Sequence, residues 1–543
     1  MKYLAFIVVL FFSSCREEDV DFIIYNATIY TVDNIFSTAD AMVVRDGKIV
    51  HVGSKKDLLD WYDAKEKIDA GGAFIYPGLI DAHAHFKAYG QSLFQVNLYG
   101  AKSWEEAVDR IRKFADEHPA EEWITGRGWD QNVWETKEFP NNSQLNQYFP
   151  HKPVLVTRVD GHAAIANEKA LQLAGVKAGD LLIGGTVETK EGKLTGLLID
   201  NAVDRVSSKL PVANKETYAK WLVEAQNNCF KQGLTTIADC GLMYNDIEMI
   251  DVLQKEGVIK MPLYVMMSDD PENYKRYLKK APYKTDLLFV KGIKVYSDGA
   301  LGSRGACLMH PYTDEPSWTG FLLKDRNYFD SLAKAVIHTD YQLCTHAIGD
   351  SANRVILSIY KEALLAANDK RWRIEHAQVV DVNDFSTFRE ASIIPSVQPT
   401  HATSDMYWAE KRLGPQRIKN AYAYKQLLQQ NGWLPLGTDF PVEDISPFKT
   451  FLAAVFRQDA AGYPATGFQP ENALTREEAL RGMTIWAARS CFLEEEVGSL
   501  EKGKKANFVI LDKDLMKVHP REVLSTKVLA TYINGKTVYS APK

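Results

Sequence analysis

The sequence predicts an α/β protein whose body is a TIM-type (β/α)8 barrel, joined to a β domain from both chain ends and carrying a large insertion. Three observations support this fold class. Short apolar runs alternate with helical stretches through the middle of the chain, and strand-and-turn patterns occur near both ends. One connection after the first barrel strand is also far longer than a single helix requires.

The composition is that of a globular protein with a large core. The chain has 543 residues, of which 46% are hydrophobic and 25% charged. A formal net charge of −6, a pI near 6.1 and the lack of a Lys/Arg cluster argue against nucleic acid as a partner. Five cysteines are scattered without paired spacing, so we expect no disulfide framework: Cys229, Cys240, Cys307, Cys344 and Cys491.

The first fifteen residues are typical of an export signal. A basic Lys2 precedes an apolar run over residues 3–12, which is too short to span a bilayer, since that needs about 20 residues. The ending Ser13-Ser14-Cys15 predicts a bacterial lipoprotein signal over residues 1–15, with Cys15 lipidated. The membrane would then be contacted only through this anchor, on the periplasmic or surface side of the cell envelope. The alternative is an ordinary signal peptide with an incidental cysteine.

Both flanks of the chain have a strand-rich pattern. Apolar runs at 22–30, 41–45 and 48–52 include an Asp46-Gly47 turn, and the runs at 506–511, 528–533 and 537–539 include an Asn534-Gly535 turn. Asp-Gly and Asn-Gly are strong hairpin signals. We therefore expect residues 16–78 and 490–543 to form one composite β domain.

The central body, residues 79–97 and 211–489, has the repeat pattern of a barrel. Helical periodicity occurs at 330–338 and 352–365 between candidate strands. The eight candidate strands are 79–85, 235–240, 263–268, 292–298, 342–346, 372–376, 393–398 and 435–439. The first connection is interrupted by residues 98–210, which we expect to form an insertion subdomain that covers the mouth of the barrel.

Ionisable side chains lie at the ends of these apolar strands, where TIM barrels carry their function. The set comprises His83, His85, Lys294, His346, His376 and Asp439. Taken singly, each has a plain structural explanation, such as a core histidine, an ion pair of Lys294 with Asp298, or a turn at Asp439. Together they favour a metal site, because buried ionisable groups need compensation and imidazole and carboxylate are metal ligands.

The motifs around these residues resemble the amidohydrolase superfamily, and within it the YtcJ-like branch (amidohydrolase family 3) that includes N-substituted formamide deformylases. The similarity runs from about residue 21 to the C-terminus, and two insertion motifs, GRGWDQNVW (126–134) and RVDGHAAIAN (158–167), mark the branch. The strand-end motifs are YPGLIDAHAHF (76–86), GIKVYSDGALGSRGA (292–306), THAIGDSAN (345–353), RIEHAQ (373–378) and LGTDFPVE (436–443).

The resemblance implies a distorted barrel with a β-sandwich, and two divalent metal ions, zinc by preference. By resemblance, His83, His85 and Asp439 would bind the buried metal, and His346 with His376 the exposed one. Lys294 would bridge them after carboxylation by CO₂, and we expect burial to lower its pKa and favour this reaction. A water shared by the metals would be deprotonated near pH ~7, and Asp439 would pass its proton to the leaving amine. A homodimer is common in the family.

Further residues are candidates for contact with a small-molecule substrate. Arg158 and His162 lie in the insertion beside Trp129, and these three could instead be the subdomain's own core and ion pairs. The other candidates lie on the fourth strand or in loops after strands four and seven: Tyr296, Asp298, Arg304, Trp318 and His401.

The leading hypothesis is hydrolysis of an amide-type C–N bond in an N-substituted formamide or another N-acyl amine, and not a peptide bond. A mononuclear deaminase is a weaker hypothesis, because those enzymes lack the strand-four lysine. Two more hypotheses stay open: an ester or lactone hydrolase, and a lipid-anchored binding protein without activity.

Overall fold

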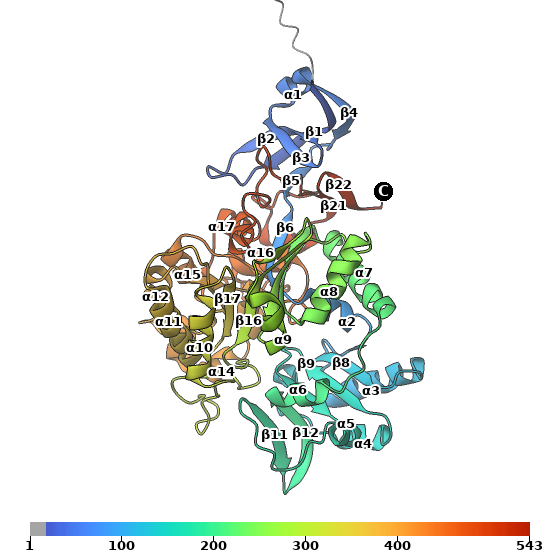
Figure 1. Ribbon diagram of the computed structural model, residues 1–543, viewed down its shortest axis with the longest axis vertical. Coiled ribbons are helices and arrows are strands. Elements are labelled where there is room, and N and C mark those ends of the chain that lie inside the picture. The colour runs from blue at the N-terminus through green and yellow to red at the C-terminus, as the bar shows by residue number, and fades with distance from the viewer. Residues whose placement is uncertain (1–17, 543) are drawn as a thin grey trace, which may run out of the picture.

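The computed structural model describes residues 18–542, which form three parts along the long axis of the molecule (Figure 1). A β domain lies at the top of this view, the barrel in the middle and the insertion at the bottom. The predicted signal segment and Cys15 lie outside the described residues.

The β domain is one hydrogen-bonded sheet built from both ends of the chain. Its strand order is β22-β21-β20-β5-β1-β2-β3, with β4 paired to β1. The sheet folds back on itself, so that the ring of Phe22 lies 6.4 Å from that of Phe508 and 6.1 Å from that of Tyr532. Its elements are β1 (Glu18–Tyr30), β2 (Thr38–Arg45), β3 (Lys48–Gly53), α1 (Lys55–Trp61), β4 (Tyr62–Asp69), β5 (Phe74–Pro77), β20 (Phe508–Leu511), β21 (Val528–Ile533) and β22 (Lys536–Ser540).

Both hairpins predicted in this domain are present. The turn residues Asp46, Gly47, Asn534 and Gly535 all have positive φ angles, between 49° and 72°. Two consecutive positive φ angles define the type I′ turn, which matches the twist of the flanking strands and which Asp-Gly and Asn-Gly adopt most readily.

The barrel contains seven regular parallel strands in the order β6-β13-β14-β16-β17-β18-β19. They confirm the predicted fold class and follow seven of the eight predicted ranges. The strands are β6 (Leu79–Ala84), β13 (Leu234–Leu242), β14 (Leu263–Ser268), β16 (Leu288–Tyr296), β17 (Gln342–Ala347), β18 (Arg373–His376) and β19 (Ile394–Ser396), with the short β15 (Tyr283–Lys284) antiparallel to β16.

The eighth position of the ring is filled by an irregular segment, so the prediction of a regular strand at 435–439 is wrong. Backbone hydrogen bonds still bridge the gap between β19 and β6. Gly437 donates to the carbonyl of Val397 (3.0 Å), Ala82 donates to that of Leu436 (3.2 Å), and Asp439 donates to that of His83 (2.8 Å). The segment leaves strand geometry because Asp439 has a φ of 65°.

Helices surround this sheet and cover its outer face (Figure 1). The start of α7 shows why the chain is helical there, since the side chain of Asn214 accepts the backbone N–H of Thr217. The helices are α2 (Phe86–Ser92), α7 (Lys215–Lys231), α8 (Tyr244–Lys255), α9 (Pro271–Asn273), α10 (Arg326–Val336), α11 (Asp350–Leu364), α12 (Phe385–Glu390), α13 (Pro399–Asp405), α14 (Ala409–Arg417), α15 (Tyr424–Asn431), α16 (Pro447–Phe456), α17 (Arg476–Gly482) and α18 (Ile485–Ser490).

The insertion has a sheet and a core of its own. The strand order is β11-β12-β10-β9-β8-β7, and the rings of Trp104, Trp129 and Trp134 pack together in its core. Its elements are β7 (Val96–Asn97), α3 (Trp104–Glu117), β8 (Ile124–Trp129), α4 (Ser143–Tyr148), β9 (Val154–Arg158), β10 (Ala163–Ala166), α5 (Glu168–Leu173), β11 (Gly185–Lys190), β12 (Lys193–Asp200) and α6 (Asn201–Ser207).

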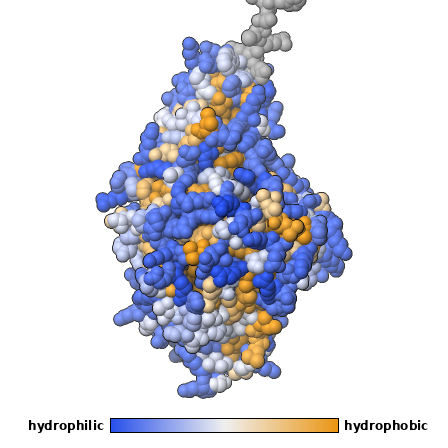
Figure 2. Space-filling model, turned by 90° about the vertical axis from the view of Figure 1, so that its left-hand side faces the viewer, coloured by the Kyte–Doolittle hydropathy of each residue, from blue (hydrophilic) through white to orange (hydrophobic). Residues whose placement is uncertain are grey.

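The molecular surface mixes polar and apolar residues. On the face drawn in Figure 2, hydrophilic residues predominate and apolar residues form small separate groups. Among residues 18–542, no helix is both long enough and apolar enough to cross a membrane.

Candidate metal centre

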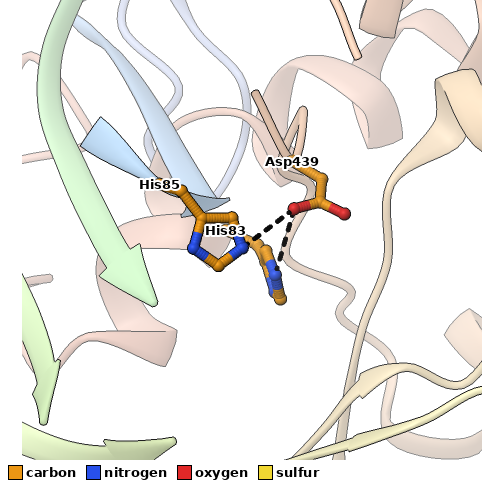
Figure 3. Close-up of side chains that lie close together, drawn as sticks. All are labelled: His83, His85 and Asp439. Atoms are coloured by element: carbon orange, nitrogen blue, oxygen red, sulfur yellow. Dashed lines mark ion pairs between the residues drawn. The ribbon is translucent and has the colours of Figure 1, made fainter. Parts of the chain in front are cut away.

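Two histidines at the end of β6 face the carboxylate of Asp439 (Figure 3). The Nε2 atoms of His83 and His85 lie 3.5 Å and 3.3 Å from Oδ1 of Asp439. Alternation along the strand places both imidazoles on one side, and the irregular eighth segment brings the carboxylate to them. The ligand atoms of this group lie within 4.8 Å of one another, which is close enough to share one metal ion.

The two oxygens of Asp439 have different surroundings. Oδ2 lies 3.2 Å from Nε2 of His401, whereas Oδ1 is buried and has no hydrogen-bond donor among the described residues. Burial of an unpaired carboxylate oxygen is costly, and a cation between Oδ1 and the two histidines would remove that cost. These residues therefore fit a divalent ion, with two imidazoles and a carboxylate as its ligands.

His346 and His376 complete the set of histidines at the strand ends. Their ring centres are 4.6 Å apart, and that of His376 is 4.8 Å from that of His83. Burial and the neighbouring histidine hold the pKa of His346 well below its usual value, and burial with His83 does the same for the pKa of His376. Both imidazoles are therefore neutral, which is the form that binds metal.

His401 was predicted as a substrate contact, and the structure places it beside the metal-ligand candidates. His376, His401 and Asp439 form a second group whose ligand atoms lie within 4.8 Å of one another. The Nδ1 atom of His401 also lies 3.1 Å from Oε1 of Glu443. His401 thus orients Asp439 through Oδ2 and leaves Oδ1 directed at His83 and His85.

Lys294 lies beside His83 and lines the same cavity as the other four candidate ligands. Its Nζ is buried, 3.4 Å from Nε2 of His83 and 4.6 Å from the centre of the Tyr296 ring. Burial lowers the pKa of Lys294, but the attraction of Tyr296, Cys240 and nearby carboxylates outweighs it, and the net shift is upward. Burial thus acts in the expected direction, but the neighbouring groups shift the balance toward the protonated amine. Divalent cations beside Lys294 would oppose the protonated form, because like charges repel.

A buried ion pair supports His83 from behind, and the sequence reasoning missed it. Glu375 accepts from Nδ1 of His83 (2.5 Å) and from Nη2 of Arg373 (3.1 Å). Its Oε1 also lies 2.6 Å from Nε of Arg373 as an ion pair, and all three side chains are fully buried. Such a contact fixes the tautomer and orientation of a metal-binding imidazole. Gln398 has the same relation to His376, with its Oε1 2.7 Å from Nδ1. The signal was local, because Arg373 and Glu375 alternate on one strand face just before His376.

Five of the six candidate ligands line a cavity of about 940 Å³ between the barrel and the insertion: His85, Lys294, His346, His376 and Asp439. Four of the predicted substrate contacts line it: Arg158, His162, Tyr296 and His401. The Nδ1 of His162 lies 2.6 Å from Oδ1 of the buried Asp200, and its ring lies 5.2 Å from that of His346. The insertion therefore contributes an oriented imidazole to the site.

The other four predicted contacts do not line the cavity. Trp129 is fully buried in the core of the insertion, where its Nε1 donates to the carbonyl of Val156, so it does not reach the cavity. Arg304 pairs with Asp314, and its carbonyl accepts from Nε1 of Trp318. Asp298 is buried beneath His346 and accepts the backbone N–H groups of Cys307, Ile348 and Gly349.

Comparison with known proteins identifies the family. A model of the amidohydrolase family matches residues 66–539. The chain belongs to this family. Protein LONG AFTER FAR-RED 3 of Arabidopsis thaliana is 33% identical, with 96% of this chain and 91% of that protein covered. Putative amidohydrolase YtcJ of Bacillus subtilis is 28% identical (94% and 98% covered), and N-substituted formamide deformylase of Arthrobacter pascens is 26% identical (96% and 98% covered).

The fold of this amidohydrolase is also that of solved structures. An uncharacterized metal-dependent hydrolase from Pyrococcus horikoshii is 27% identical, with a TM-score of 0.75 and with 92% of this chain and 99% of that chain covered. The resemblance to the YtcJ-like branch is thereby confirmed. Family, fold and candidate ligand set together make the chain a metal-dependent hydrolase of the amidohydrolase superfamily.

Proposed function

We propose that this hydrolase cleaves an amide-type C–N bond of a small N-acyl amine, with N-substituted formamides as the first class to test. One observation carries the proposal: the buried oxygen Oδ1 of Asp439 has no hydrogen-bond partner among the described residues and faces His83 and His85, and Asp439 and His85 line a cavity that can hold a small molecule. The similarity to the N-substituted formamide deformylase over nearly the whole of both chains supports the choice of substrate.

The proposed metal ligands are His83, His85, His346, His376, Asp439 and a carboxylated Lys294, with zinc as the proposed metal. Two divalent ions held there would polarise the acyl carbonyl and make a water acidic enough to act as the nucleophile near neutral pH. The carbamate on Lys294 would form from CO₂ and the neutral amine.

Asp439 is the proposed proton carrier. With Oδ2 held by His401, it can accept a proton from the attacking water and deliver it to the departing amine nitrogen. Tyr296 and His162 face the cavity from the barrel and the insertion, so they can donate hydrogen bonds to the developing oxyanion. The Asp200 contact keeps the His162 ring in one orientation.

The N-terminal sequence adds a proposal on location. A lipid on Cys15 would tether the enzyme to the bacterial cell envelope, facing the periplasm or the cell surface. A homodimer is proposed from the family resemblance alone.

The test combines metal analysis with amine release. Wild type purified without chelator should contain close to two divalent ions per chain and release amine from N-substituted formamides. Chelation should abolish turnover, and added zinc should restore it. Lys294→Ala should lower both metal content and turnover sharply, because it removes the bridging group.

Lys291→Ala is the matched control. Lys291 lies on the same strand, but its Nζ donates to the carbonyl of Asp340 (2.5 Å), away from the ligands. We expect this variant to keep the metal and the activity of wild type. One ion per chain, unchanged in Lys294→Ala, would refute the bridged two-metal site.

A further inference from the structure

The insertion directs an arginine into the cavity. Arg127 lies on β8 between two glycines, and its side chain lines the cavity. Both glycines are needed there. A Cβ at Gly126 would lie 2.9 Å from Cβ of Val96, and one at Gly128 would lie 2.5 Å from the ring of Tyr99. A Cβ at Gly161, across the cavity wall, would come within 3.2 Å of Nη2 of Arg127.

The guanidinium of Arg127 is held at two of its three nitrogens. Nε donates to the hydroxyl of Tyr99 (3.3 Å), and Nη2 donates to the carbonyl of Val159 (3.0 Å). Nη1 has no hydrogen-bond acceptor within residues 18–542, and no carboxylate pairs with Arg127 there. Nη1 is therefore available to a ligand, and a guanidinium can bind a carboxylate with two parallel N–H donors.

The other Lys and Arg side chains that line the cavity are already engaged. Arg158 is paired with Asp130 and Asp160, and Lys449 with Asp444. Lys294 lies among the candidate metal ligands. Within the described part of the chain, Arg127 is thus the cavity cation that has neither a carboxylate partner nor a place in the metal centre.

Arg127 is connected to the framework of the metal centre. The Tyr99 hydroxyl, which accepts from Arg127, donates in turn to the carbonyl of Pro441. The adjacent carbonyl of Phe440 accepts the backbone N–H of His85 (2.8 Å). The guanidinium and the segment that carries Asp439 therefore hold fixed positions relative to each other, as an anchor for one end of a substrate requires.

We propose that Arg127 binds a carboxylate of the substrate, so that the preferred class is an N-acyl amino acid rather than a neutral N-acyl amine. This inference rests on the proposed C–N bond hydrolysis. Arg127 is a specificity-determining residue that holds the carboxylate end while the acyl group reaches the metal centre. A planar carboxylate is favoured over other anions because two parallel N–H donors match its two oxygens.

The experiment compares substrate pairs that differ only in the carboxylate. N-formyl-phenylalanine and N-(2-phenylethyl)formamide form one pair, and the same comparison is made for N-formyl derivatives of leucine, methionine and alanine. In wild type, kcat/KM should be about 10- to 100-fold higher for the carboxylate member, which is the range of a charge-assisted hydrogen-bonded pair. Arg127→Met should remove this preference, because it should lower kcat/KM about 10- to 100-fold more for the carboxylate member than for the neutral member.

Two further variants separate recognition from structure. Arg127→Lys keeps the charge without the fork and should retain part of the preference. Arg110→Met is the matched control. Nη1 of Arg110 donates to the backbone carbonyl of Tyr99 (2.9 Å), but Arg110 does not line the cavity. It should keep the full preference for the carboxylate member.

Calorimetric binding of the same pairs distinguishes failure of this inference from failure of the proposed function. If wild type binds the carboxylate members more tightly and Arg127→Met abolishes this difference, the result supports Arg127 as the carboxylate-binding residue. This holds even if no member is hydrolysed and the proposed function is refuted. Hydrolysis of both members without any preference overturns the anchor and leaves the proposed function standing. A preference that survives in Arg127→Met, or no binding of any carboxylate member, also overturns it.

Discussion

Replacing Glu375 by Gln should weaken metal binding and stability together, because this carboxylate supports both His83 and Arg373. The three side chains are fully buried, with contacts of 2.5 Å to His83 and 2.6 Å to Arg373. Burial raises the pKa of Glu375, but Arg373 and His83 outweigh it, and the net shift is downward. Glu375 is therefore ionised, and the substitution would keep the shape of the side chain while removing its charge.

The expected losses of metal affinity and of stability in Glu375→Gln can each be given a magnitude. Loss of a carboxylate behind a metal-binding histidine typically lowers metal affinity 10- to 100-fold, or about 1.4 to 2.7 kcal/mol. Breaking a buried ion pair from one side costs about 3 to 5 kcal/mol of stability, because the partner charge stays buried. Arg373 keeps hydrogen bonds to the Ala82 carbonyl (2.6 Å) and the Ser396 hydroxyl (2.7 Å), so we expect the lower end of that range.

The assay is zinc titration against a competing chelator, together with urea unfolding of the same samples after metal removal. The double variant Arg373→Met/Glu375→Gln should recover much of the stability, since no unpaired charge remains, but not the metal affinity. Glu494→Gln is a matched control, because Glu494 pairs with Arg371 outside the metal centre (2.8 Å). Unchanged zinc affinity in Glu375→Gln, or affinity that recovers with stability in the double variant, would refute the reasoning.

Two other predictions concern stability. Burial raises the pKa of Asp405 to about 7 from 3.8, against the attraction of His401 and the hydrogen bond from Tyr422. The protonated Asp405 therefore contributes fully to stability below about pH 4, and this contribution is lost as the pH rises to about 7. The free energy of unfolding of Asp405→Asn, measured in urea, should rise by about 1 to 3 kcal/mol relative to that of wild type over this pH range. A gain independent of pH would contradict this. Trp129→Phe should cost about 1 to 4 kcal/mol, because it removes a buried hydrogen bond and core volume, with KM unchanged. A raised KM would instead place Trp129 in the substrate site.

Several features were predictable because they depend on short stretches of chain. Strand alternation placed His83 and His85 on one face, and the dipeptide turns at 46–47 and 534–535 predicted both hairpins. Apolar runs separated by helical stretches predicted seven of the barrel strands closely enough to identify the fold. The strand-end motifs identified the branch of the superfamily without any knowledge of the packing.

The supporting contacts could not be predicted, because they join residues far apart in the sequence. Glu375 meets His83 across 292 residues, and the Tyr99 hydroxyl meets Pro441 across 342. Such contacts depend on strand register and on how the insertion docks over the barrel. The sequence therefore named Trp129, which is buried in the core of the insertion, and did not single out Arg127, which lines the cavity from the same strand.

The sequence by itself determined the order of the strands, the ligand types at their ends and the family. Only the tertiary structure decided which side chains face the cavity, how the irregular eighth segment presents Asp439, and which way the pKa of Lys294 shifts. The physical reason is range: periodicity and turn preferences act over a few residues. Burial and electrostatic attraction depend instead on every neighbour that the fold brings within a few ångströms.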